Sequence, residues 1–151
     1  MILPPAVLKT VLSHAAAAYP AECCGLISIS EGPSADIRVW PIRNIQDAMH
    51  QKTPQEFTRT SKTAYWMDPV ELLRAQKQMR QNAAQLFMIY HSHTDSEAYF
   101  SAEDECLALD DRGEPLYPDA VYFVVPVKNG MAGDGVFFKW NSASRKFLPV
   151  G

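Results

Sequence analysis

The chain has 151 residues, a length typical of one domain, of which 47% are apolar, 21% charged and 11% aromatic. This ordinary composition excludes a collagen-like, coiled-coil or disordered chain. The 14 basic and 17 acidic residues leave a net charge of -3, so the chain lacks the strongly basic composition that is typical of nucleic-acid-binding proteins. Three cysteines are too few, and odd in number, for a disulfide framework.

The first 18 residues are apolar and superficially resemble a secretory signal. They lack positive charges at their start, contain Pro4-Pro5 and place Lys9 where a signal keeps its apolar centre. No run of 18 apolar residues occurs, so no membrane span is predicted. We expect a soluble, cytoplasmic protein whose residues 1–151 form a single domain.

The N-terminal part of the sequence predicts a helix followed by a hairpin. A helix between Pro5 and Pro20 is indicated by apolar residues at helical spacing, namely Leu8, Val11, Leu12, Ala15 and Tyr19. Residues 25–30 alternate like a strand, and residues 37–42 form its hairpin partner after a turn. Residues 46–62 are polar and weakly periodic, which indicates a loop or a flap facing the substrate.

A second helix is predicted from Asp68 to about Asn82. It begins with an N-cap, a proline at the first helical position and, three residues after the cap, the acid Glu71. We expect it to bury Leu72, Leu73, Met79 and Ala83. Its basic residues, Arg74, Lys77 and Arg80, are interpreted as a solvated face.

The C-terminal half predicts more strands than helices. Residues 86–90 are continuously apolar, which is typical of a strand buried on both faces. Ser101 and Asp104 form a capping box that opens a short helix. Three closing strands are predicted at residues 121–127, 135–140 and 146–150. The fold class is therefore α/β, a mixed β-sheet packed by helices.

The segment that follows the buried strand reads His-Ser-His, then seven residues, then Ser-Ala-Glu-Asp. Side chains two apart on a strand share a face, so His91 and His93 can point at one ion while Ser92 faces the other way. Asp104 falls in the first turn of the next helix, which can fold back toward the strand end. Two imidazoles and one carboxylate match a catalytic zinc site, in which a fourth position stays open for water.

Each of these residues also has an ordinary explanation. A His-x-His pair is often a surface or hydrogen-bonded pair, and Ser101 and Asp104 are accounted for by the capping box. By itself, Glu22 would be a solvated acid after a proline turn. The combination at the end of an apolar strand is more specific than its parts, so we interpret it as a metal site.

The pattern resembles the metal motif of the JAMM (MPN-positive) metallopeptidases. The segment Tyr19–Leu26, with its glutamate followed by Cys-Gly-Leu, resembles the upstream part of that motif. Segments Met67–Leu73 and Tyr117–Val121 are similar to framework segments of small prokaryotic members. The chain departs from the family pattern at Thr94 and Phe100, where members of this type usually carry proline.

The resemblance implies the MPN/JAMM fold, which is related to that of cytidine deaminases, and a role for each motif residue. His91, His93 and Asp104 would hold one Zn²⁺ per chain, with water in the fourth position. Zinc brings the pKa of such a water near 7. Glu22 would accept the proton of the water and deliver it to the leaving amine. Ser101 would donate a hydrogen bond to the developing oxyanion.

The resemblance also implies a substrate. Small prokaryotic relatives process ubiquitin-like sulfur-carrier proteins, and they hydrolyse a peptide or isopeptide bond after a C-terminal Gly-Gly. Glycines carry no side chain, so such a tail fits a narrow slot and can pair its backbone with an edge strand. We expect a carrier protein as the partner, and neither nucleic acid nor a membrane.

Three alternatives differ from this interpretation. A non-catalytic scaffold or binding domain would resemble the MPN-negative relatives, but these have generally lost the ligands that are present here. A zinc deaminase needs His-x-Glu followed by Pro-Cys-x-x-Cys, and neither occurs. A cysteine hydrolase would use Cys24 with His91, although we interpret the cysteines, including Cys23 and Cys106, as packing residues.

Overall fold

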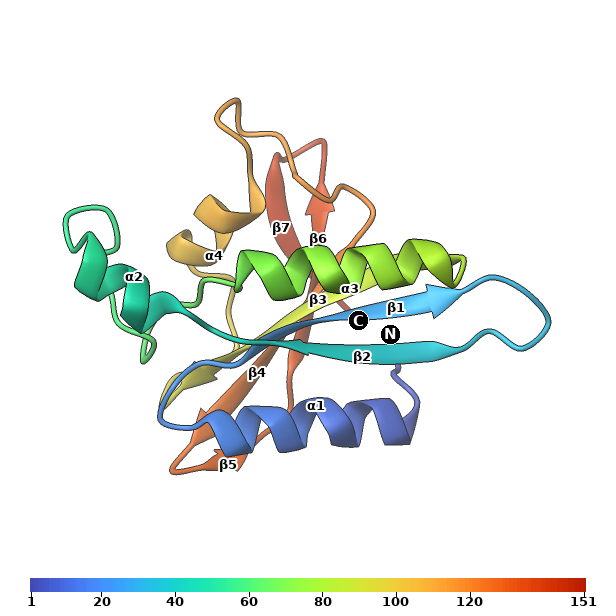
Figure 1. Ribbon diagram of the computed structural model, residues 1–151, viewed down its shortest axis with the longest axis horizontal. Helices are drawn as coiled ribbons and strands as arrows, with labels where there is room; N and C mark the ends of the chain where they lie inside the picture. The colour runs from blue at the N-terminus through green and yellow to red at the C-terminus, as the bar shows by residue number, and fades with distance from the viewer.

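The computed structural model describes residues 1–151 as a seven-stranded sheet with helices on both faces (Figure 1). The helices are α1 (Pro5–Ala18), α2 (Gln46–Lys52), α3 (Pro69–Gln81) and α4 (Ala102–Ala108). The strands are β1 (Cys24–Ser30), β2 (Ile37–Ile42), β3 (Ala84–Thr94), β4 (Val121–Lys128), β5 (Met131–Ala132), β6 (Val136–Asn141) and β7 (Lys146–Val150). The α/β class predicted from the sequence is confirmed.

The sheet is mixed, as predicted. Its strand order is β2-β1-β3-β4-β6-β7, and β5 pairs with the end of β4. Only β3 and β4 run parallel, whereas the other neighbouring pairs are antiparallel. Parallel strands need a crossover, and here the crossover carries α4. Helix α4 is thereby placed close to the carboxyl end of β3, where the two histidines lie.

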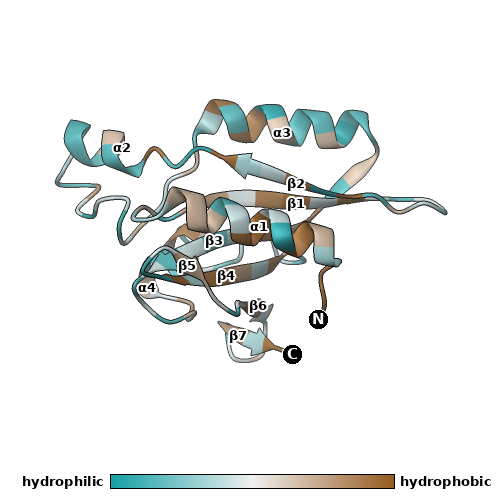
Figure 2. Ribbon diagram, turned by 90° about the horizontal axis from the view of Figure 1, so that it is seen from below, coloured by the Kyte–Doolittle hydropathy of each residue, from teal (hydrophilic) through white to brown (hydrophobic).

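Both faces of the central strands are buried. Helix α1 covers one face, and α3 and α4 cover the other (Figures 1 and 2). Side chains alternate between these two cores, so that Tyr90 packs beneath α1 while its neighbour Ile89 packs beneath α3. This burial on both sides explains why β3 and β4 read as continuous apolar runs in the sequence.

Helix α2 lies in the region that we expected to be a loop or a flap, and that expectation is wrong for residues 46–52. The helix has seven residues and no side-chain cap, so the usual start signal is missing from its sequence. Gln46, at its first position, is buried and donates a hydrogen bond to the carbonyl of Arg59, 2.9 Å away. This bond ties α2 to the segment that precedes α3.

Helix α3 confirms the predicted start but buries a different set of residues. It buries Ala75 and Met79, which lie one turn apart on the same face. Leu73 is 66% exposed, because residues two apart on a helix point in nearly opposite directions. Ala83 is exposed as well, since it lies beyond the helix end with a φ of 49°. The expectation that Leu73 and Ala83 belong to the core is therefore wrong.

The predicted capping residues of α3 serve two different purposes. The Asp68 carboxylate accepts a hydrogen bond from the Val70 N–H at 2.9 Å, as expected of an N-cap. The Glu71 carboxylate instead accepts from the Arg43 N–H at 2.7 Å. The acid predicted to complete the cap thus ties α3 to the residue that follows β2.

A glycine allows the close approach of β1 and an aromatic side chain of β3. A Cβ atom at Gly25 would lie 2.4 Å from the ring of Tyr90, so no larger residue fits there. The Tyr90 hydroxyl in turn lies 2.8 Å from Nδ1 of His14, on α1. No helix of the chain combines the length and the apolar character that crossing a bilayer requires.

Candidate active site

Strand β3 carries two histidines on one face near its carboxyl end. His91 and His93 are two residues apart, so their imidazoles leave the strand on the same side, and both are buried. Ser92 faces the opposite side, where its hydroxyl accepts a hydrogen bond from the Cys23 N–H at 2.8 Å. The orientation predicted for these three residues is confirmed.

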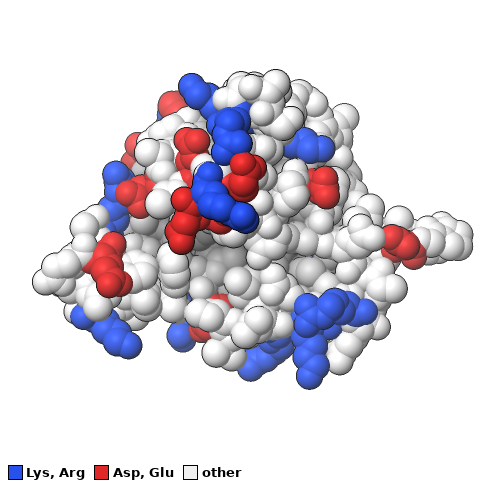
Figure 3. Space-filling view, turned by 90° about the horizontal axis from the view of Figure 1, so that it is seen from above, with Lys and Arg blue, Asp and Glu red and all other residues white.

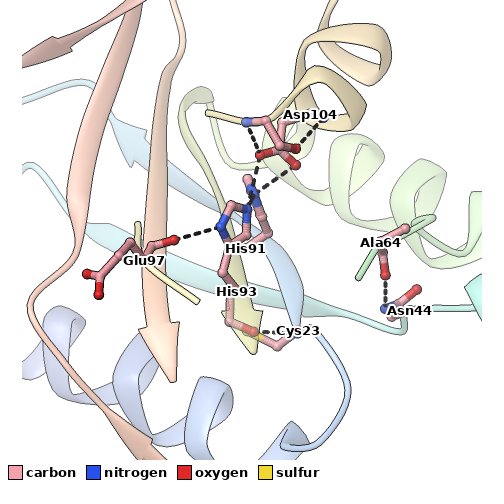
Figure 4. A network of polar contacts seen from close by, with 9 residues as sticks. Cys23, Asn44, Ala64, His91, His93, Glu97 and Asp104 are labelled. Carbon is pink, nitrogen blue, oxygen red and sulfur yellow. Dashed lines mark hydrogen bonds and ion pairs between the residues drawn. The ribbon is translucent and has the colours of Figure 1, made fainter. Parts of the chain in front are cut away.

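Helix α4 aims a carboxylate at both imidazoles. The Ser101 hydroxyl accepts from the Asp104 N–H at 3.1 Å, and Asp104 Oδ2 accepts from the Ser101 N–H at 2.9 Å, which completes the predicted capping box. The two oxygens of Asp104 lie 3.0 Å from His91 Nε2 and 3.1 Å from His93 Nε2 (Figure 4). The cap therefore fixes the direction in which Asp104 points.

The donor set of this cluster fits a metal ion. Its three ligand atoms lie within 4.8 Å of one another, and all three side chains are buried. His93 Nδ1 lies 2.9 Å from the carbonyl oxygen of Glu97 (Figure 4). A carbonyl can only accept, so Nδ1 carries a proton and directs Nε2 toward the ion. The buried group of His91, His93 and Asp104 can thus hold a metal.

The electrostatics of the cluster keep its carboxylate ionised. Burial disfavours the charged forms of both His93 and Asp104. Contacts within the cluster outweigh burial. The hydrogen bond and charge of Asp104 raise the pKa of His93, and the attraction of His91, with hydrogen bonds from both imidazoles, holds the pKa of Asp104 far below its usual range. A metal ligand must be deprotonated, and Asp104 meets that condition.

Glu22 lies in the same cleft, two residues before the start of β1. Its side chain is buried, with only 5% of the residue exposed, and Oε2 has no hydrogen-bond partner. Burial raises its pKa to about 8. The alternative interpretation of Glu22 as a solvated acid is therefore wrong. A buried carboxyl oxygen without a partner is unusual, and such groups are concentrated at functional sites.

The backbone of Glu22 is held from two sides. Its N–H donates to the Ser61 carbonyl at 2.7 Å, and its carbonyl accepts from the Asn44 side-chain amide at 2.9 Å. Asn44 also donates to the Ala64 carbonyl (Figure 4). The sequence did not single out Asn44, because its partners come from distant segments and no local pattern marks it.

The cleft is small and polar. It encloses about 80 Å³ and is lined by Glu22, Arg59, Lys62, Thr63, His93, Thr94, Ser96, Tyr99 and Ser101. Aromatic rings flank the histidines, with Tyr65 4.7 Å from His91 and Tyr99 4.9 Å from His93, measured between ring centroids. The predicted site residues thus lie close together. Glu22, His93 and Ser101 line the cleft, whereas His91 and Asp104 are buried next to His93.

The loop between His93 and Ser101 carries both departures from the family pattern, and its own side chains hold it in position. Phe100 packs against Tyr122, Phe138 and Phe147 in the core beneath α3 and α4. Thr94 donates its hydroxyl to the Lys62 carbonyl. Both residues that replace the usual prolines therefore make contacts that position the loop.

The cysteines do not form a nucleophilic site. Cys23 and Cys24 are buried in the two cores, as expected for packing residues, but Cys106 is exposed, so this expectation is wrong for Cys106. Cys24 pairs with His91 across the strands, yet its thiol lies 3.4 Å from the Ile42 carbonyl. Burial raises the pKa of Cys24 well above its ordinary value, which disfavours the thiolate that a cysteine hydrolase needs.

The chain belongs to the family of prokaryotic homologs of the JAB domain, which it matches over residues 4–141. The JAMM/MPN resemblance inferred from the sequence is thereby confirmed. Among curated proteins, the CysO-cysteine peptidases of Mycobacterium bovis and Mycobacterium tuberculosis are 30% identical to it over 122 residues, which cover 81% of this chain and 70% of theirs.

Two solved structures have the same fold. A protein from Desulfitobacterium hafniense aligns with a TM-score of 0.65 and 25% identity, over 97% of this chain and 86% of its own. A protein from Salinibacter ruber aligns with a TM-score of 0.64 and 22% identity, over 100% of this chain and 89% of its own.

Proposed function

We propose that this protein is a zinc-dependent peptidase that hydrolyses a peptide or isopeptide bond after the C-terminal Gly-Gly of a ubiquitin-like sulfur-carrier protein. The observation that carries the proposal is that the buried group of His91, His93 and Asp104 lies beside a cleft that His93 lines together with Glu22. Family membership and the name of the mycobacterial relatives, CysO-cysteine peptidase, support the same reaction class.

In this proposal, His91, His93 and Asp104 hold one zinc ion per chain. Two neutral imidazoles and one carboxylate form a ligand set of the kind that catalytic zinc sites use. When bound, zinc supplies a Lewis acid for the scissile carbonyl and lowers the pKa of the attacking water toward neutrality. Glu97 and Ser101 orient the ligands through their backbone groups.

Glu22 acts as the general base and then as the general acid. Its unpartnered Oε2 lies in the cleft, so it can accept a proton from the attacking water and return it to the leaving amine. Burial raises its pKa to about 8, although the nearby His93 and Arg59 charges lower it, and general acid–base catalysis is most effective when the pKa lies near the working pH.

Ser101 stabilises the oxyanion that develops on the scissile carbonyl. Its hydroxyl oxygen accepts the cap hydrogen bond from Asp104, and that leaves the hydroxyl proton free to donate into the cleft. Loss of one such donor costs about 2.7–4 kcal/mol of transition-state stabilisation in well-studied hydrolases.

The substrate tail enters a cleft of about 80 Å³, and glycines suit so small a space because they carry no side chain. Figure 3 shows acidic and basic side chains interspersed over the upper part of one face and a group of basic side chains along its lower edge. The net charge of -3 supports a protein partner rather than nucleic acid. We place the reaction in the cytoplasm, within a single domain.

The substitution Glu22→Gln tests the proposal. The zinc-loaded variant is expected to retain about one metal per chain and to lose about 10²–10⁴-fold in the cleavage of a Gly-Gly-extended carrier. Glu31→Gln, in the exposed β1–β2 turn, is the matched control and should cleave normally. Normal cleavage by Glu22→Gln would show that the base is wrongly assigned.

A further inference from the structure

A second pocket lies on the face of the sheet that α3 and α4 cover, and the proposed reaction does not use it. It encloses about 230 Å³ between α3, α4, the sheet and the segments that precede α3 and β4. It shares no lining residue with the candidate cleft. The two spaces are therefore separate, although the ring of Tyr65, which lines the second pocket, lies 4.7 Å from that of His91.

The lining of this pocket is aromatic and uncharged. Four of its eleven lining residues carry aromatic rings, and we call it the aromatic pocket after Tyr65, Trp66, Tyr117 and Tyr122. None of the eleven is charged, so a charged ligand group would lose its hydration without gaining a counter-charge. Aromatic side chains attract a further ring in stacked or edge-to-face arrangements. The lining thus favours an uncharged aromatic ligand.

Two buried tyrosines bring polar groups to the aromatic pocket. Only 6% of Tyr65 and 3% of Tyr122 is exposed, and neither hydroxyl makes a hydrogen bond within the protein. The unpartnered side-chain atoms that are fully enclosed belong to Glu22 and His91 alone, so these two hydroxyls border open space. A buried hydroxyl without a partner is costly, and a ligand atom that accepts its proton removes that cost.

The hydroxyl of Tyr117 shows which kind of polar group the ligand needs. It accepts a hydrogen bond from the side-chain amide of Gln76, on α3, at 3.2 Å. Its own proton therefore remains free to donate, as do those of Tyr65 and Tyr122. The aromatic pocket offers donors from three tyrosines, which calls for a ligand with an acceptor atom such as a carbonyl oxygen.

The volume of the aromatic pocket limits the size of the ligand. Its 230 Å³ exceeds the roughly 150 Å³ of an engineered apolar cavity that binds benzene. It is smaller than the roughly 300–1,000 Å³ of pockets that hold drug-sized molecules. Leu116, which lines the pocket, is 52% exposed and marks its opening to solvent. A molecule with one or two rings can therefore enter and fit.

We propose that the aromatic pocket binds a small uncharged aromatic molecule of one or two rings, whose acceptor atom is held by the hydroxyls of Tyr65 and Tyr122. The binding site is distinct from the candidate metal centre and does not depend on the peptidase reaction.

Acetophenone is the probe that tests this proposal, because it combines one ring with a carbonyl acceptor. Ethylbenzene has the same size without the acceptor, and benzoate carries a charge. NMR titration of the full chain should show a saturable shift of the Trp66 indole N–H on addition of acetophenone. We expect a Kd between about 0.1 and 1 mM, about tenfold below the values for ethylbenzene and benzoate. The indole signals of Trp40 and Trp140, which do not line the pocket, should move little.

The double variant Tyr65→Phe/Tyr122→Phe removes the two hydroxyls and keeps both rings. Its affinity for acetophenone should fall about tenfold, to that for ethylbenzene, while its unchanged affinity for ethylbenzene shows that the pocket is intact. Tyr99→Phe is the matched control, because Tyr99 lines the other cleft and should leave all three affinities unchanged. The absence of a saturable Trp66 shift, equal affinity of the wild-type protein for all three probes, or a retained preference for acetophenone in the double variant would overturn the proposal.

Discussion

The side-chain amide of Asn44 donates a hydrogen bond to the backbone carbonyl of Glu22, with the two atoms 2.9 Å apart. The same amide nitrogen lies 3.2 Å from the Ala64 carbonyl, and its oxygen accepts from the N–H groups of Gln46 and Trp66 at 3.0 Å. One side chain thus fastens three segments to one another. Glu22 is placed by this network, since its own carboxylate has an unpartnered oxygen.

Asn44→Ala is therefore expected to disturb catalysis more than metal binding. Losing these hydrogen bonds should cost about 1–3 kcal/mol of unfolding free energy and lower kcat, because Glu22 is no longer held in place. Zinc content and KM should change little. Asn141→Ala, which removes a turn-capping amide far from the cleft, is the control. An unchanged kcat in Asn44→Ala would rule out the positioning role.

Metal removal is expected to destabilise the protein, because folding brings the three ligands together. A ligand present at about 100 times its Kd adds about 2.7 kcal/mol of stability. We expect the Tm of the wild-type protein to fall on treatment with a chelator, whereas the Tm of His91→Ala should not respond. His50→Ala should behave like the wild type, since His50 bonds to the Phe57 carbonyl outside the cluster. A chelator response in His91→Ala would contradict the ligand assignment.

Burial of Glu22 predicts an unusual pH dependence for the metal-free protein. Its pKa rises from 4.5 to about 8, so between these values the folded chain keeps a proton that the unfolded chain releases. The free energy of unfolding should therefore decrease as the pH rises through this window. Glu22→Gln removes this contribution and should gain stability relative to the wild type as the pH rises. Urea unfolding at several pH values measures the difference, and parallel curves for the two proteins would refute it.

Phe100 is expected to stabilise the loop between the second histidine and α4. It is only partly buried, so Phe100→Ala should cost about 2–3 kcal/mol, less than the roughly 3–5 kcal/mol of a fully buried phenylalanine. Phe100→Leu keeps most of the apolar volume and should cost less. Denaturant titration checks both variants. Equal stability of Phe100→Ala and the wild type would mean that the aromatic contacts contribute nothing.

The three cysteines should differ sharply in reactivity. An alkylating reagent is expected to modify only Cys106 in the folded protein, because Cys23 and Cys24 are buried. Burial raises the pKa of Cys23 to about 12 and that of Cys24 well above its ordinary value, so both remain thiols. Mass spectrometry counts the labels. Peptidase activity should survive this labelling, whereas labelling of Cys24 accompanied by loss of activity would support the cysteine-hydrolase alternative.

Local signals explain which parts of the fold were predictable. Strands β2 and β7 have the predicted bounds, since turn residues flank both of them. Helix α2 has no side-chain cap, and β5 contains only two residues, so neither carries a sequence signal strong enough to predict it. Strand order was not predicted at all, because periodicity shows which face of a strand is buried but not which strand lies beside it.

The residues of the candidate site also differ in how far the sequence alone could predict them. Strand periodicity and the capping box place His91, His93 and Asp104 by local geometry, so their convergence followed from the sequence. Glu22 was identified only through the family resemblance, since nothing near it in the chain marks it as a base. Asn44 was missed because its role depends on backbone groups that only the tertiary structure brings within reach.

The three proposed metal ligands lie within fourteen consecutive residues of the chain, from His91 to Asp104. Closing so short a loop costs little chain entropy, so an unfolded chain can already gather these ligands around an ion. Metal would then bind the unfolded state to some extent, which reduces the stabilisation that binding to the folded state provides. Such binding would also bring β3 and α4 together early in folding, before the distant segment that carries Glu22 has docked.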